Sequence, residues 1–238
     1  VAISGSRVRY LHGGRGGPLL FLHGWPANPK TYRHALELLA NSFTVYVPYM
    51  FDLDCASIRE TAQRVNSLIK GLGISKAVVI GISFGGAVAG LLSQDKKLVS
   101  KLVLINTAGV PREASFAKML ANLLKSSLPM LMKGKASHFF QRYASSAAFL
   151  ALLRTARGRK LFGEIRKSAK THTCYIFQRL SIPTTIIWCR NDNVFPVSNA
   201  AVLQQLIKNS KLVIVDADHY WPFHKPEHFA ETIVAHVK

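Results

Sequence analysis

The chain has 238 residues, of which 49% are hydrophobic, so it is long and apolar enough to form a folded domain and is not a disordered protein. Lysine and arginine total 31 against 12 acidic residues, which gives a formal net charge of +19. No apolar run approaches the ~18 residues that a transmembrane helix needs. The first residues lack the basic and apolar regions of a signal peptide.

The cysteines, Cys55, Cys174 and Cys189, are odd in number and widely spaced. This pattern fits neither a disulfide framework nor a zinc site, and it is typical of a reducing compartment. A cytoplasmic location is therefore expected, and neither a metal nor a cofactor is predicted.

Predicted strands and helices alternate along residues 1–110. Apolar, often β-branched runs predict strands at 8–11, 19–22, 43–47, 78–80 and 102–105. Residues 12–18, rich in glycine, are predicted to form a loop. Helices are predicted at 31–40, at 57–72 behind the capping-box sequence Ser57-Ile58-Arg59-Glu60, and from Gly86 onward.

Residues 111–180 contain no strand-like run, and their apolar side chains recur at helical spacing, which predicts a helical insertion. The segment carries fourteen Lys and Arg residues against Glu113 and Glu164. One hypothesis is a weak contact of this basic segment with anionic surfaces; the other is a general basic bias of the source proteome. Nucleic acid is not expected as a partner, because the basic residues are not interleaved with stacking aromatic residues.

After this insertion the alternation resumes. Strands are predicted at 184–188 and 212–215, and helices at 198–207 and 226–236. Strands and helices in alternation predict an α/β fold with a mostly parallel, doubly wound sheet that is covered on both faces. Ligands of such sheets bind beyond the carboxyl ends of the strands. The core is thus expected at 1–110 and 181–238, with the insertion at 111–180.

A sharp turn with a serine at its centre is predicted where the strand at 78–80 ends. The sequence Gly81-Ile82-Ser83-Phe84-Gly85 has the G-x-S-x-G pattern of a nucleophile elbow. Small residues are needed there because a serine on such a turn crowds the backbone. The alternative is a glycine-rich turn without chemistry.

Two further loops follow predicted strands and carry the partners that a nucleophilic serine needs. His219 is placed to act as the general base, and Asp192 is placed to orient the imidazole. The order Ser83, Asp192, His219 is that of α/β-hydrolases. Asp216 and Asp218 are alternative acids, although they lie very close to His219 along the chain. His224 and His228 are alternative bases at the start of the last helix.

With these motifs in place, the chain resembles an α/β-hydrolase-fold serine hydrolase of the esterase and lipase kind over nearly its whole length. His23-Gly24-Trp25-Pro26 resembles the oxyanion loop of that family, and 191–196 its acid loop. The resemblance implies that the backbone N–H groups of Trp25 and Phe84 form the oxyanion hole. It also implies that residues 111–180 are a helical lid. Trp25, Phe84 and Val194 are predicted to contact the substrate.

The expected reaction is hydrolysis of a small carboxylic ester through an acyl-enzyme on Ser83. A carbon–carbon bond hydrolase, a perhydrolase, or a ligand-binding receptor with vestigial hydrolysis would use the same residues. A serine at position 83 argues against epoxide hydrolase or dehalogenase chemistry, since those relatives use an aspartate there. The loop at 51–57 departs from the family pattern because it lacks both usual glycines.

Overall fold

The computed structural model describes residues 2–3, 6–25, 27–53, 55, 57–110, 163 and 174–237. The strands are β1 (Ala2–Ile3), β2 (Ser6–Arg7), β3 (Tyr10–Gly14), β4 (Pro18–Leu22), β5 (Thr44–Pro48), β6 (Ala77–Ile82), β7 (Val99–Ile105), β8 (Thr184–Cys189) and β9 (Ser210–Val215). The helices are η1 (Pro29–Tyr32), α1 (Arg33–Leu39), η2 (Met50–Asp52), α2 (Ile58–Gly71), α3 (Phe84–Leu92), α8 (Cys174–Gln178), α9 (Ser198–Leu206), α10 (Trp221–His224) and α11 (Pro226–Val237).

A twisted sheet forms the middle layer, with strands in the order β3-β5-β4-β6-β7-β8-β9. β3 runs antiparallel to β5, and the other neighbouring strands of this sheet are parallel. β1 and β2 form a separate antiparallel pair. The predicted α/β-hydrolase fold, with its mostly parallel sheet, is confirmed.

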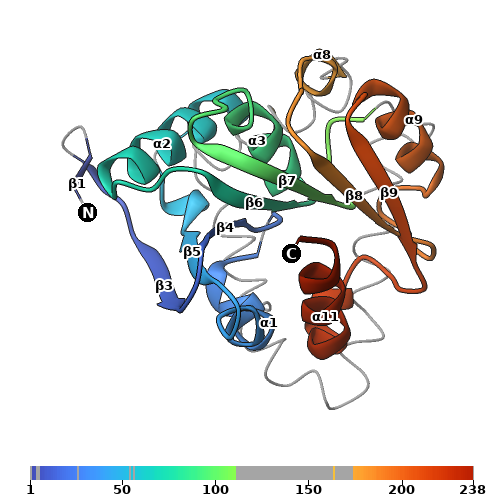
Figure 1. The fold of residues 1–238 in the computed structure, drawn as a ribbon, viewed down its shortest axis with the longest axis horizontal. Coiled ribbons are helices and arrows are strands. Elements are labelled where there is room, and N and C mark those ends of the chain that lie inside the picture. Colours follow the sequence, from blue (N-terminus) through green and yellow to red (C-terminus); the bar gives the residue numbers. More distant parts are fainter. Residues whose placement is uncertain are drawn as a thin grey trace.

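Helices cover both faces of the sheet (Figure 1). On one face α2, α3, α8 and α9 pack over one apolar cluster, and on the other face α1 and α11 pack together over a second. The central strands bury side chains on both faces, which explains their continuous apolar sequences. The predicted N-terminus of α2 is correct: the Ser57 hydroxyl accepts the Glu60 N–H at 3.1 Å.

The prediction for residues 8–18 was wrong in its boundaries. The strand continues to Gly14 and the next strand starts at Pro18, so the loop is confined to residues 15–17. Among the described strands, β3 lies at the edge of the sheet and pairs with β5, from Tyr10 opposite Pro48 to Gly14 opposite Thr44. Gly14 has a φ of 96° and lies so close to Phe43 that a side chain would collide with its carbonyl oxygen. Gly14 therefore marks the last residue of the strand, where the backbone turns tightly, and not the middle of a long loop.

Of the predicted insertion, residues 111–162 and 164–173 lie outside the described part of the chain, and with them the predicted lid and its basic surface. The described end of the insertion, α8, packs on the core: a side chain on Gly90 of α3 would crowd Phe177 at 2.9 Å. Within the described residues, no helix has the length and apolar character required to cross a membrane.

Candidate active site

Ser83 occupies the sharp turn between β6 and α3. Its φ of 54° and ψ of −120° place a non-glycine residue in a conformation that is rarely adopted. Three backbone hydrogen bonds hold the turn: the Ser83 N–H donates to Ile105, and the Ser83 carbonyl accepts from Gly86 and Ala108, each at 3.0 Å. The serine is thus fixed by β7 on one side and by its own helix on the other. The residue is 9% exposed.

His219 lies beside Asp192, and the two come from different strand ends. The Nδ1 atom of His219 is 2.7 Å from Oδ2 of Asp192. Since a carboxylate only accepts, the imidazole proton belongs on Nδ1 and the lone pair on Nε2 remains for another proton. The other oxygen of Asp192, Oδ1, accepts the N–H groups of Val194 and Phe195 at 2.7 and 2.8 Å.

The alternative acids have other contacts. Asp216 accepts a hydrogen bond from the Asn191 amide at 2.9 Å. Asp218 accepts the N–H of Tyr220 at 2.8 Å and lies 3.5 Å from His224. The alternative bases, His224 and His228, are both exposed. The geometry therefore pairs His219 with Asp192.

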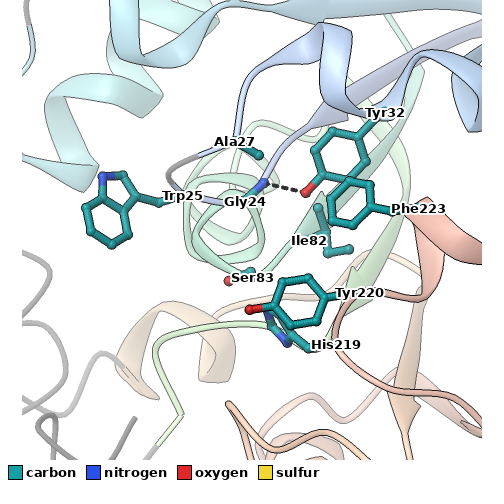
Figure 2. A pocket seen from close by; sticks show the side chains of 9 residues that line it. All are labelled: Gly24, Trp25, Ala27, Tyr32, Ile82, Ser83, His219, Tyr220 and Phe223. Atoms are coloured by element: carbon teal, nitrogen blue, oxygen red, sulfur yellow. Dashed lines mark hydrogen bonds between the residues drawn. The ribbon is translucent and has the colours of Figure 1, made fainter. Parts of the chain in front are cut away.

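A small cavity of about 20 Å³ brings Ser83 and His219 to a common space. Figure 2 shows both side chains at this cavity, together with Tyr32, Tyr220 and Phe223. Within the described part of the chain no hydrogen bond links the Ser83 hydroxyl to His219. Such contacts in hydrolases often tighten only with substrate in place. The arrangement has the parts needed for a serine nucleophile with a histidine base.

The predicted oxyanion loop, which follows β4, lies directly against Ser83 at Gly24. A side chain on Gly24 would come within 3.2 Å of the Ser83 Cβ, and one on Gly85 would overlap the carbonyl oxygen of Leu22. These contacts bring the end of β4 against the N-terminus of α3. His23 is fully buried: its Nε2 accepts the Met50 N–H at 3.4 Å, and its Nδ1 lies 3.1 Å from the Gly24 carbonyl. Its ring thus holds the backbone of this loop against the start of η2.

The three predicted substrate-contact residues have different positions. Trp25 borders the cavity, but its indole extends away from Ser83, Tyr32 and His219 (Figure 2). The Phe84 ring is buried and packs 5.5 Å from Phe51, centroid to centroid. Val194 is buried in the core and contributes its backbone to Asp192. Substrate contact by these side chains stays a prediction.

Tyr32 and Tyr220 both line the cavity, although neither was predicted to belong to the site. Tyr32 falls within the helical spacing of 31–40 and therefore looked like a core residue. Tyr220 directly follows His219, and only this adjacency could have indicated its position. Burial raises the pKa of Tyr32, with a smaller increase from Tyr220, while the N–H of Gly24 lowers it. Its hydroxyl is thus neutral at ordinary pH.

Cys189 is buried at the end of β8, near the acid loop. Its thiol accepts a hydrogen bond from the Asn106 amide at 3.1 Å, and its N–H donates to the same side chain at 2.8 Å. In the described segments, histidine, cysteine and carboxylate side chains do not gather in groups of three that could bind a metal ion.

The sheet topology and the serine between β6 and α3 define an α/β hydrolase. The sequence matches the model of the alpha/beta hydrolase family over residues 19–232, so the chain belongs to that family.

Relatives of this chain include proteins with and without an assigned activity. An uncharacterized protein of Mycobacterium tuberculosis is 26% identical, covering 97% of this chain and 78% of its own. A 2-hydroxy-6-oxo-6-(2'-aminophenyl)hexa-2,4-dienoic acid hydrolase of Metapseudomonas resinovorans is 23% identical, in an alignment that covers 99% of this chain and 89% of the relative. The crystal structure of a membrane phospholipase A, described as a bacterial virulence factor, superposes with a TM-score of 0.82 at 22% identity. The superposition covers 100% of this chain and 84% of the phospholipase chain. At this identity the superposition shows a shared fold.

Proposed function

We propose that this protein is a serine hydrolase that cleaves carboxylic esters through an acyl-enzyme on Ser83. One observation carries the proposal: Ser83, on its strained turn, faces the same cavity as His219, and His219 is hydrogen-bonded to buried Asp192. A serine hydroxyl is a weak nucleophile at neutral pH and needs such a base beside it.

The proposed reaction has two halves. In the first, the Ser83 hydroxyl attacks the ester carbonyl and His219 Nε2 takes its proton. The N–H groups of Trp25 and Phe84 stabilise the oxyanion, and His219 then returns the proton to the leaving alcohol. In the second half, a water attacks the acyl carbon while His219 takes the water proton; the bond between the acyl carbon and Ser83 Oγ then breaks, His219 returns the proton to Oγ, and the carboxylic acid is released. Asp192 stabilises the imidazolium in both halves.

The test is a panel of p-nitrophenyl esters of increasing acyl length, assayed with the native chain and with Ser83→Ala. The native chain is expected to turn over at least one ester, and Ser83→Ala is expected to lose at least 10³-fold in kcat because the nucleophile is gone. An unchanged melting temperature checks that the variant folds. Equal hydrolysis by both proteins would contradict the proposal.

A carbon–carbon bond hydrolase is the second candidate, and the dienoic acid hydrolase named above favours it, since that relative aligns with nearly the whole chain. The same assay discriminates between the two when vinylogous diketones are added to the panel.

A perhydrolase would instead form peracid from hydrogen peroxide and a carboxylic acid. A receptor with vestigial hydrolysis would bind its ligand but turn over more slowly than about once a minute, far below the usual ~10 s⁻¹.

A further inference from the structure

Tyr32 connects the oxyanion loop to the rest of the site through its hydroxyl. The residue ends η1, is 3% exposed, and accepts the N–H of Gly24 at 3.3 Å (Figure 2). Gly24 directly precedes Trp25, whose N–H is the proposed oxyanion donor. The Gly24 N–H is part of the His23–Gly24 peptide, so its hydrogen bond to Tyr32 holds the peptide group directly before the one that carries the Trp25 N–H.

The ring of Tyr32 is itself held by two aromatic neighbours. Its centroid lies 5.1 Å from that of Phe21 on β4 and 4.7 Å from that of Phe223 on α10. α10 begins two residues after His219, so Phe223 belongs to the segment that carries the base. Tyr32 therefore contacts both the loop of the oxyanion donor and the segment of the histidine.

The turn that carries Tyr32 is also well anchored. The side chain of Asn28 accepts the Lys30 N–H at 2.9 Å, and the Asn28 N–H donates to the Thr31 hydroxyl at 3.3 Å. This capping box fixes the start of η1. A phenol on a rigid turn, packed between two rings, is suited to hold a neighbouring backbone in place.

We propose that Tyr32 is a positioning residue for the reaction: its hydroxyl holds the His23–Gly24 peptide, which sets the direction of the next peptide and its Trp25 N–H, and its ring aligns this loop with the histidine segment. The inference rests on the proposed function, because it assumes that Trp25 stabilises an oxyanion at Ser83. It adds a residue that touches neither the nucleophile nor the base by a hydrogen bond. Tyr32 acts through the loop.

The test replaces Tyr32 by Phe, which keeps the ring and removes the acceptor of the Gly24 N–H. The first readout is the rate at which a fluorophosphonate probe labels Ser83, since its phosphoryl oxygen occupies the oxyanion position. We expect labelling and kcat to fall about tenfold, less than the 10²–10³-fold loss of a whole oxyanion donor, because the donor is displaced and not removed. KM should stay within about twofold.

The matched control is Tyr46→Phe on β5, which removes a hydroxyl from a tyrosine that lies beside Tyr10, away from the cavity. Both variants are compared by melting temperature and by active-site titration, so that a loss of folded protein is separated from a loss of rate. A purely structural role for Tyr32 would lower the titrated fraction and leave the rate per titrated site unchanged, which would overturn the inference.

The outcomes separate the two proposals. If the native chain is labelled and Tyr32→Phe is labelled at the same rate per site, the positioning role is wrong while the proposed function stands. If the native chain is neither labelled nor active on any ester, the proposed function fails and the role of Tyr32 fails with it.

Should Tyr32→Phe not fold, Phe223→Leu removes the ring contact instead. A labelling rate equal to that of the native chain would then count against the inference.

Discussion

Asp192 uses both carboxylate oxygens within the site. Oδ2 contacts His219, and Oδ1 accepts the N–H groups of Val194 and Phe195, while the side chain itself is fully buried. The two N–H groups fix the rotation of the carboxylate, so the orientation of His219 is determined by the backbone of the acid loop. Val194 thus contributes to the orientation of Asp192 through its backbone N–H.

We expect Asp192→Asn to lower kcat by about 10⁴-fold, because an amide in this position favours the wrong imidazole tautomer and cannot stabilise the imidazolium. Steady-state kinetics on the best ester of the panel checks this. The control is Asp216→Asn, which alters a carboxylate that contacts Asn191 rather than His219. A loss of less than tenfold in Asp192→Asn would show that another group orients the base.

The positions of Ser83, Asp192 and His219 could be predicted because each follows an apolar strand and their order along the chain is informative. Their roles in catalysis remain proposals. Tyr32 could not be found in this way. Its partner is a backbone N–H eight residues away, and no residue type in the sequence marks that contact. Helical spacing correctly indicated burial of Tyr32, but burial alone does not distinguish a core tyrosine from one at a site.

At the scale of elements, the elbow depends on the close approach of α3 to its neighbours. A side chain at Gly85 would overlap the Leu22 carbonyl, and one at Gly86 would overlap the Thr107 side chain. The first contact is with backbone at the end of β4, which cannot move without moving the oxyanion loop. The second is with a side chain after β7. Glycine at these positions lets the helix start next to the sheet.

Gly85→Ala is therefore expected to destabilise the fold by about 1–3 kcal/mol, as overpacked sites do, and to abolish most of the activity. Denaturant unfolding and the ester assay measure the two effects. Gly71→Ala is the matched control, since a side chain there meets no atom within 4 Å. It should change stability by less than about 1 kcal/mol. Full activity in Gly85→Ala would contradict the close packing.

The longer helices and strands were predictable from their apolar periodicity, whereas the short elements were not. η1, η2 and α10 span four, three and four residues, too few to show a helical period. Two of them carry residues that matter for the site: η1 ends at Tyr32, and α10 contains Phe223. The sequence of the loop at 51–57 lacks the two glycines usual in the family, but this difference did not predict the contacts that the loop makes. In the structure Phe51 packs against His23 and Phe84.

For the molecule as a whole, burial of ionisable groups makes stability depend on pH. The pKa of Cys189 is raised to about 12, foremost by burial, with Asp192 and Asp218 raising it further and the Asn106 amide lowering it. The folded chain therefore keeps a proton that the unfolded chain releases near pH 9. Stability from this source is complete below pH 9 and is lost as the pH rises towards 12.

We expect the free energy of unfolding to fall between pH 9 and 12 with a slope from Cys189 of at most about 1.4 kcal/mol per pH unit. Tyr32, whose pKa is also raised, adds to the fall in the upper part of this range. Denaturant unfolding at several pH values measures the slope, and Cys189→Ala should make it shallower. An identical slope in both proteins would show that the thiol does not titrate in this way.

The strained backbone at Ser83 has a consequence for how this sequence can evolve. The turn would be relaxed by glycine, the residue that adopts a positive φ at little expense. Selection for stability alone would thus favour replacement of Ser83 by a single substitution. Such a chain would be more stable and keep the same fold, but it would lack the hydroxyl on which the proposed reaction depends. If the proposed function is correct, relatives with glycine at this position are expected to be more stable and inactive.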